Sequence, residues 1–474
     1  MTHSHESHRL SWLEKTVLVH VGALLLFSSW AFGGNIWWAR LTLSIWGSLA
    51  LPLCIAAFLQ GHGRGRHARR KLGWLIPPAL YAGLVFASTY NPSFASTFID
   101  GGLLLAHKGA AHPQWPSTVS AAQSLDSLWF GAGLYLSAFN LAVVIRSRRA
   151  LHFLLILISV NAVALAVMGT VQKLSAAGFY FGAATSPNAR FFASFIYYNH
   201  WGAFMVLCLA TTAGLLFNQA RHHHGRDMWQ SPFSAALVGF LFIAISGPLS
   251  ASRAATVMSA FLVLVATGHA LLRLAAARHR AHRPLWPAAT TLLAVVTLTI
   301  AAVAWLGFRG ISERYHQTQI ALAQNQSLWG ERMAVYADTA ELARRQPVFG
   351  WGLNSYDIAF QLVRPRPLQA SRQYENHYAT AHNDWLQSLA ETGLVGTTLL
   401  ILTLAVPLAH LTRRKLRHPL VAYPLLGLAV VLLYALIEFP FSSGAFLITF
   451  WVLFFTALRK AELTVDTPPP PQAP

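Results

Sequence analysis

Two arginines lie at the ends of long apolar runs, where a charged side chain is unusual. Arg190 comes shortly before the run at 197–217, and Arg253 lies at the start of the run at 252–273. A cation at membrane depth is costly and needs a partner, yet neither arginine has an acidic neighbour in sequence. Each side chain therefore either reaches out to lipid phosphates or belongs to a pocket for an anionic group, because the planar guanidinium binds phosphate through paired hydrogen bonds.

A histidine stands out in a third segment, from Ala381 to Gly396. Apolar residues follow it at helical spacing, and Asn383 or Asp384 is placed to cap that helix. Imidazole can take up a proton near neutral pH, which makes His382 a candidate general base at the mouth of the helix. Taken alone, such a histidine is more often a surface or hydrogen-bonding residue, so both interpretations stay open.

The composition indicates which elements position these residues. Of the 474 residues, 55% are hydrophobic and only 11% are charged, against roughly 25% charged in soluble domains. Long apolar runs of about 20 residues are typical of helices that span a membrane and satisfy their own backbone. We therefore expect an all-α integral membrane protein with about twelve transmembrane helices. The runs lie near 16–34, 37–59, 73–89, 127–146, 150–171, 197–217, 232–249, 252–273, 286–307, 392–411, 419–437 and 442–458.

The distribution of Lys and Arg predicts the orientation. Most of the 35 basic residues fall at the two ends of the chain or in alternate links between spans, as in cytoplasmic segments under the positive-inside rule. Both termini are then cytoplasmic, and Arg190, Arg253 and His382 face the opposite side. The same pattern explains the net charge of +19, so we expect a lipid bilayer and no nucleic acid as the partner.

Four parts of the chain follow from this topology. They are helices one to nine in 1–307, a large external loop in 308–391, the last three helices in 392–458, and a proline-rich tail in 459–474 that we expect to be disordered and cytoplasmic. Within the loop, residues 329–346 are predicted to form an amphipathic helix that Pro347 stops. A second helix is predicted to begin near His382 and to lead into the tenth span.

The segment at His382 resembles a known signature. His382-Asn383, nine residues, Gly393, two residues and Gly396 follow the pattern of the O-antigen ligase and O-antigen polymerase superfamily. Three further segments resemble parts of that family in the same order, over about 190–400 in all. They are Arg190 to Asn199, Ser252-Arg253, and Arg332 with Pro347, Gly350 and Gly352.

The resemblance implies a glycosyltransferase of the bacterial inner membrane that uses no metal and no cofactor. Its donor would be a glycan on undecaprenyl pyrophosphate, and transfer would occur on the periplasmic face. His382 would activate the acceptor hydroxyl as general base, and Arg190 and Arg253 would bind the pyrophosphate, with Arg332 as an auxiliary contact. The expected supporting residues are Asn199, Asn383, Asp384, Glu391, Gly393 and Gly396.

The chemistry of the residues is compatible with this activity. A pyrophosphate leaving group gains charge as its glycosidic bond breaks, so fixed cations stabilise the transition state more than the ground state. Asp384 and Glu391 are expected to shape the helix or to orient His382. Glu438, near the external end of the eleventh span, is as consistent with a structural role as with a place in the site. The three histidines at 222–224 are interpreted as part of a solvated loop, not as a metal site.

Four functions remain open at this stage. A ligase would move a finished polysaccharide to an acceptor glycolipid such as lipid A–core, and it is favoured because the loop is long and no further domain follows. A polymerase of the same superfamily would extend a growing polysaccharide, such as O-antigen or exopolysaccharide. A protein O-oligosaccharyltransferase is less expected. An anion transporter is also less expected, because paired repeats with broken helices are not evident.

Overall fold

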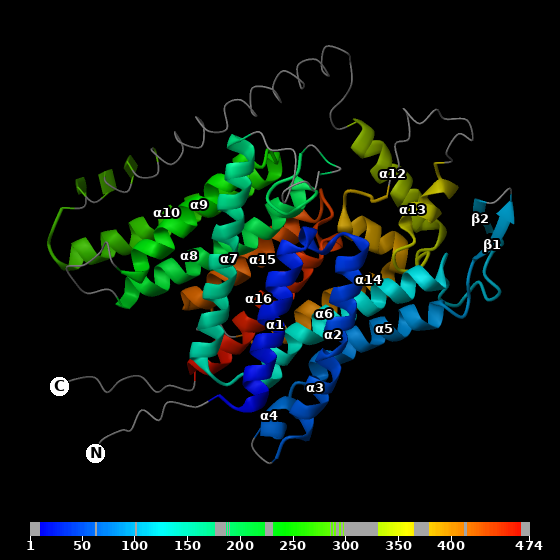
Figure 1. Cartoon of the computed structure of the whole chain (residues 1–474), viewed down its shortest axis with the longest axis horizontal. Coiled ribbons are helices and arrows are strands. Elements are labelled where there is room, and N and C mark those ends of the chain that lie inside the picture. The colour runs from blue at the N-terminus through cyan, green and yellow to red at the C-terminus, as the bar shows by residue number, and fades with distance from the viewer. Residues whose placement is uncertain are drawn as a thin grey trace, which may run out of the picture.

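Helices make up nearly all of the computed structural model (Figure 1). It describes residues 10–61, 64–99, 102–175, 190–222, 231–284, 330–364, 379–411 and 415–465, with a few positions at 186–188 and 286–297. The strands described are β1 (Phe94–Ile99) and β2 (Gly102–His107), an antiparallel hairpin in the link between the predicted spans 73–89 and 127–146. The all-α membrane class predicted from the apolar runs is thus supported.

Nine of the described helices are long and apolar enough to cross a membrane. They are α1 (Trp12–Trp30), α2 with α3 (Trp37–Ser48 and Ala50–Leu59), α6 (Ala121–Val144), α7 (Arg148–Leu174), α8 (Tyr198–His222), α9 (Pro232–Leu249), α10 (Arg253–Arg280), α14 (Asp384–Leu408) and α16 (Gly444–Val465). Two shorter apolar helices, α5 (Ile76–Ser88) and α15 (Pro419–Tyr434), coincide with two more predicted spans. The ninth predicted span, 286–307, lies largely outside the described residues, so the total of twelve stays a prediction.

The centre of the bundle is formed by α8 and α16. All of the apolar window of α8 is buried within the protein, and 89% of that of α16, against 28% for α10. The outer helices expose apolar side chains such as Leu264 and Ile55, as a surface in contact with lipid requires. Small residues let helices approach closely: a Cβ on Gly47 of α2 would lie 3.0 Å from the backbone of Gly133 of α6.

The first described helix begins, and the last one ends, at the same end of the bundle. The backbone N–H of Arg146 donates to Glu14 of α1, and the side chain of Arg148 donates to the carbonyl of Leu463 in α16. α16 continues to Val465, so the first part of the segment predicted as a disordered tail is helical. Glu462 accounts for this continuation, because Lys71 and Arg459 both bind its carboxylate at 2.7 Å.

A smaller unit, called the external unit because it lies outside the helix bundle, sits on one end of the bundle (Figure 1). It contains α12 (Gly330–Arg345), at the place predicted for the amphipathic helix, and the short α13 (Tyr356–Ala359). Its own apolar core joins Leu342 and Trp351 to Ala390 of α14. The unit therefore rests on the first turns of α14, the helix that follows His382.

α14 begins at Asp384, which confirms the helix predicted after His382, and Asn383 is its cap. The Asn383 side chain accepts from the backbone N–H of Leu386 at 2.9 Å. Gly393 interrupts the helix with φ 64° and ψ −169°, and a Cβ there would lie 2.3 Å from the carbonyl oxygen of Val348. Only glycine permits both this backbone and this approach. The turn after α12 is thereby docked onto α14.

Candidate active site

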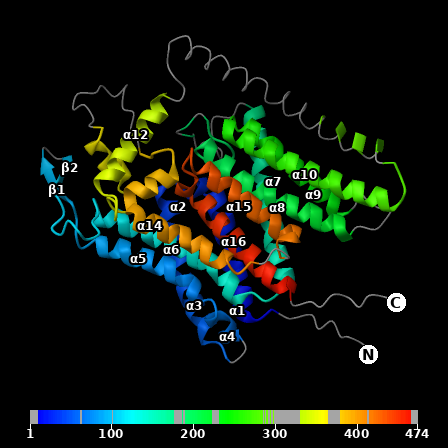
Figure 2. The ribbon, with the colours of Figure 1, turned by 180° about the vertical axis from the view of Figure 1, so that it is seen from behind.

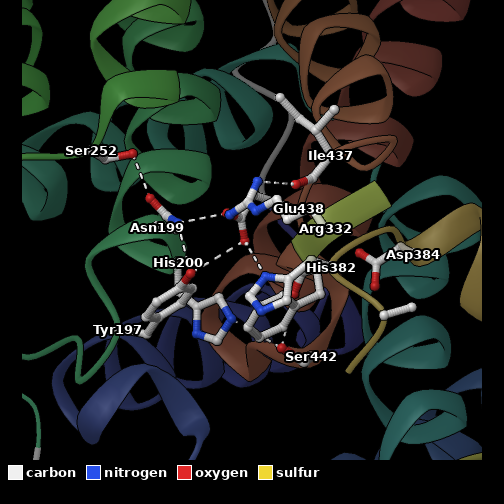
Figure 3. A network of polar contacts seen from close by, with 12 residues as sticks. Tyr197, Asn199, His200, Ser252, Arg332, His382, Asp384, Ile437, Glu438 and Ser442 are labelled. Carbon is white, nitrogen blue, oxygen red and sulfur yellow. Dashed lines mark hydrogen bonds and ion pairs between the residues drawn. The ribbon is translucent and has the colours of Figure 1, made fainter. Parts of the chain in front are cut away.

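Glu438 is the centre of a polar network at the end of the bundle that carries α12 (Figure 3). Glu438 follows α15, and the residue is 3% exposed. Arg332 Nη2 and Asn199 Nδ2 each donate to it at 2.8 Å. His382 Nδ1 and the Tyr197 hydroxyl each lie 3.4 Å from its other oxygen. Four segments that are distant in sequence therefore meet at one carboxylate, and a buried carboxylate is tolerated only with such partners.

His382 is held in one orientation by its backbone and by its ring contacts. Its φ of 51° lies in the left-handed region, which is uncommon for a residue with a side chain. Its carbonyl accepts from the Tyr336 hydroxyl at 3.0 Å, and its ring meets Phe439 edge-on with centroids 4.9 Å apart. With Nδ1 directed at Glu438 and the side chain 34% exposed, Nε2 is the nitrogen that can take a proton from a substrate.

Arg332 extends from α12 and ties the external unit to the end of α15. Besides its bond to Glu438, its Nη1 donates to the carbonyl of Ile437 at 3.2 Å. Burial disfavours the charged guanidinium, but the Glu438 carboxylate outweighs burial, and the pKa of Arg332 is raised. Arg332 therefore stays charged, and its ion pair fixes the position of the Glu438 side chain beside His382.

Asn199 and Ser252 extend the network to the start of α10. The Ser252 hydroxyl donates to Asn199 Oδ1 at 2.6 Å, and it also caps α10 by accepting from the backbone N–H of Ala255. Arg253 is the next residue, exposed at the N-terminus of α10. The free N–H groups and dipole of a helix N-terminus favour an anion there, and an arginine adds to that preference.

Tyr197 supplies a neutral donor to the same carboxylate. Burial of the phenol and the nearby Glu438 carboxylate raise the pKa of Tyr197, so it keeps its proton. Its ring stacks on Phe439, and His200 meets the same ring edge-on. His200 in turn is fixed by Asn35 at 2.8 Å and Ser442 at 3.0 Å. A packed aromatic wall thus supports the side of His382.

The predicted site residues divide into three groups. His382, Arg332 and Asn199 meet at Glu438. Arg190 and Arg253 have exposed side chains near the starts of α8 and α10, and the described contacts of the Glu438 network do not include them. Their role as phosphate ligands therefore stays a prediction.

Asp384, Glu391 and the two predicted glycines have mainly architectural contacts. The Asp384 carboxylate accepts from the backbone N–H of Phe441 at 3.1 Å, and its own N–H donates to Ala435 at 2.8 Å. Glu391 accepts from the backbone of Asn354 at 2.9 Å and of Tyr356 at 3.3 Å. Both carboxylates therefore fix loops around α14. Gly393 admits the turn after α12, and a Cβ on Gly396 would lie 2.4 Å from Thr392.

Sequence reasoning left the role of Glu438 open and missed Tyr197, Tyr336 and His200. The position of Glu438 at the end of an apolar run could have indicated its role, because an ionisable side chain at membrane depth is costly and usually has a partner or a function. Tyr197 lies within the segment from Arg190 to Asn199 that resembles the family, but no role for Tyr197 was predicted from that segment. Among the described residues, no three His, Cys, Asp or Glu side chains gather as a metal site would require.

Comparison with known proteins identifies part of the chain. Residues 238–401 match the family model described as O-antigen ligase. This stretch includes Arg253, Arg332 and His382, and it ends before Glu438. An uncharacterized protein from Haemophilus influenzae is 27% identical over 164 residues, which cover 33% of this chain and 40% of that relative. The match therefore spans about two fifths of the length of this relative.

Proposed function

Because residues 238–401 match the family model described as O-antigen ligase, we propose that this chain is a member of that superfamily and transfers a glycan from a lipid-linked pyrophosphate donor to an acceptor hydroxyl. The observation that carries the proposal is the contact of His382 Nδ1 with the buried carboxylate of Glu438, on a partly exposed ring. A carboxylate at one ring nitrogen fixes the tautomer that leaves the other nitrogen basic. This is the arrangement of an oriented general base.

The reaction follows from this arrangement. His382 Nε2 accepts the proton of the acceptor hydroxyl while that oxygen forms a bond to the anomeric carbon of the donor sugar. The bond from this carbon to the phosphate oxygen breaks, and undecaprenyl pyrophosphate leaves with the electron pair. The proton on His382 then returns to solvent. General-base catalysis of this kind contributes about 10²–10⁴-fold to a rate.

Stabilisation of the leaving group is assigned to the exposed arginines. Arg253 lies at a helix N-terminus, where both its charge and the backbone N–H groups favour pyrophosphate. Arg190 lies in the turn before α8, the helix that carries Asn199 into the network. Arg332 forms an ion pair with Glu438. It therefore serves mainly to position that carboxylate and is an auxiliary contact to phosphate.

The site lies at the external end of the bundle, and we assign that end to the periplasmic face of a bacterial inner membrane with both chain termini in the cytoplasm. The support is the distribution of Lys and Arg along the sequence. For the acceptor we favour a glycolipid such as lipid A–core, which makes the protein a ligase. Extension of a growing O-antigen or exopolysaccharide by the same chemistry is the alternative.

Deletion of the gene tests the proposal and separates these two outcomes. Envelope polysaccharide from the deletion strain is separated on a gel. A ligase is indicated by the loss of long chains from lipopolysaccharide while carrier-linked polymer persists, and a polymerase by single-repeat products. Unchanged polysaccharide would refute the proposed function.

Complementation then tests His382. The wild type is expected to restore the polysaccharide, and His382→Ala is expected to fail although it inserts normally. His279→Ala changes an exposed histidine at the far end of α10 and is the matched control. Near-normal transfer by His382→Ala would overturn the general-base assignment.

A further inference from the structure

The helix α12 of the external unit contacts the candidate site at two positions, four residues apart. Arg332 Nη2 donates to the Glu438 carboxylate at 2.8 Å. The Tyr336 hydroxyl donates to the backbone carbonyl of His382 at 3.0 Å. Residues at this spacing lie on one face of a helix, and α12 lies beside the start of α14 in both overall views (Figure 1, Figure 2). One face of α12 therefore contacts both members of the His382–Glu438 pair.

The position of α12 is fixed by side chains that face the external unit. Val335 and Leu342 are buried in the apolar core of that unit. The buried Thr339 hydroxyl donates to the carbonyl of Val335 at 2.6 Å, so it accepts from the Tyr356 hydroxyl at 2.8 Å. A helix held in this way presents Tyr336 to the site in a constant place.

The backbone of His382 has a conformation that needs support. Its φ is 51°, and a residue with a Cβ in this left-handed region has a higher free energy than at negative φ. Such conformations persist where the surrounding contacts determine them. The Tyr336 hydroxyl supplies one of these contacts, because it fixes the direction of the His382 carbonyl. Burial raises the pKa of Tyr336, so the hydroxyl keeps its proton and stays a donor.

The backbone conformation of His382 determines where its imidazole lies. Rotation to a negative φ would move the Cβ, and with it the ring, away from Glu438. His382 Nδ1 lies 3.4 Å from the Glu438 oxygen, which is longer than the roughly 2.7–3.2 Å of a strong N–H···O hydrogen bond. This side-chain contact therefore orients the ring only in part, and a contact to the backbone of His382 adds to it.

The external unit is attached to the bundle by other bonds besides that of Tyr336. The backbone N–H of Trp351 donates to the carbonyl of Ala390 at 3.0 Å. The N–H of Leu394 donates to the carbonyl of Pro347 at 2.9 Å. These backbone bonds dock the unit onto α14 directly. A hydroxyl at position 336 is thus not required for attachment, whereas it contacts the one residue assigned as the base.

We propose that Tyr336 is a positioning residue whose hydroxyl holds the backbone of His382, so that Nδ1 meets Glu438 and Nε2 is directed at the acceptor. The inference rests on the proposed function, because it concerns the orientation of a general base. Tyr336 touches no reacting atom in this role. Its loss is therefore expected to lower kcat and to leave the KM for the donor unchanged.

Removal of single tyrosine hydroxyls tests the proposal. Tyr336→Phe removes the contact to His382, and Tyr356→Phe is the matched control, because it removes a buried hydroxyl of the same unit while Thr339 keeps its bond to Val335. Transfer is measured with the purified full chain. The donor is carrier-linked glycan extracted from the deletion strain, and the acceptor is lipopolysaccharide from that strain.

The two variants are expected to have a similar Tm but to differ in rate. In Tyr336→Phe, kcat should fall roughly three- to tenfold, the factor that corresponds to the loss of one neutral hydrogen bond, with the wild-type KM for the donor. In Tyr356→Phe both constants should be those of the wild type. Equal kcat values in the two variants, or a loss in Tyr336→Phe that lies only in KM, would overturn the proposal.

A double-mutant cycle with Glu438→Gln distinguishes positioning from an independent effect. Both side chains act on the orientation of the same ring. Once Glu438 is replaced, Tyr336→Phe is therefore expected to lower kcat by less than about twofold more. Effects of the two substitutions that simply multiply would contradict the proposal.

His382→Ala in the same assay separates this inference from the proposed function. Transfer by the wild type that is lost in His382→Ala, together with a normal kcat in Tyr336→Phe, would refute the role of Tyr336 alone. Absence of transfer by the wild type would refute the proposed function, and with it the inference.

Discussion

Arg332 Nη2 lies 2.8 Å from Glu438 Oε1, and this ion pair joins the external helix α12 to the end of α15. The Glu438 side chain is 4% exposed and that of Arg332 33% exposed, so the carboxylate depends on its partners more than the guanidinium does. The same carboxylate contacts His382. The pair therefore links the placement of the external unit to the orientation of the candidate base.

Glu438→Gln is expected to lower kcat for transfer by roughly 10²-fold or more, the lower end of the contribution of a general base. The amide keeps the size of the side chain but removes the charge that holds His382 in its orientation. A transfer assay with purified protein measures the change. Glu341→Gln is the control, because Glu341 forms an exposed pair with Arg345 on the outer face of α12. Equal activity of the two variants would contradict the role of Glu438.

Arg332→Ala is expected to lower the stability of the folded protein by about 1–3 kcal/mol, because it removes the ion-pair partner of a buried carboxylate. Thermal unfolding in detergent measures this as a lower Tm. Arg345→Ala removes an exposed partner of Glu341 on the same helix, and such pairs contribute roughly 0–1 kcal/mol. If both variants unfold at the same temperature, the Arg332 pair does not stabilise the external unit.

Arg253→Ala and Arg190→Ala are each expected to slow transfer by about 10²–10³-fold, because a fixed cation at a developing charge has that effect. The Arg253 variant should insert and unfold as the wild type does, since that side chain is exposed. The matched control is Arg280→Ala, at the opposite end of α10 from Arg253. Wild-type transfer rates in both site variants would contradict the assignment of Arg253 and Arg190 as ligands of the pyrophosphate.

Gly393→Ala is expected to destabilise the protein by about 1–3 kcal/mol. The added Cβ would lie 2.3 Å from the Val348 carbonyl oxygen, on a backbone with φ 64°. Gly268→Ala in α10 is the control, because a Cβ there meets nothing within 4 Å. The yield of folded protein and its Tm report the difference. An unchanged Tm in Gly393→Ala would show that the turn after α12 moves without cost.

Features that arise from local interactions were predictable from the amino-acid sequence. Apolar runs of the right length predicted eleven spans that coincide with apolar helices, because lipid imposes that length and composition on each helix separately. A cap at Asn383 or Asp384 and a helix at 329–346 were likewise predicted from neighbours in the chain, and the structure has the cap at Asn383 and the helix at Gly330–Arg345. The motif around His382 indicated the superfamily that the match at 238–401 supports.

The assembly of the site, by contrast, depends on how the helices pack. Glu438 lies 239 positions from Asn199, 106 from Arg332 and 56 from His382. No spacing rule links such residues, because their contact depends on how whole helices pack. A cavity of about 520 Å³ is equally a product of packing, since its walls come from several helices, among them α5, α6, α14 and α16. The sequence shows which chemical group each residue supplies, whereas the packing of the helices determines which other groups that residue contacts.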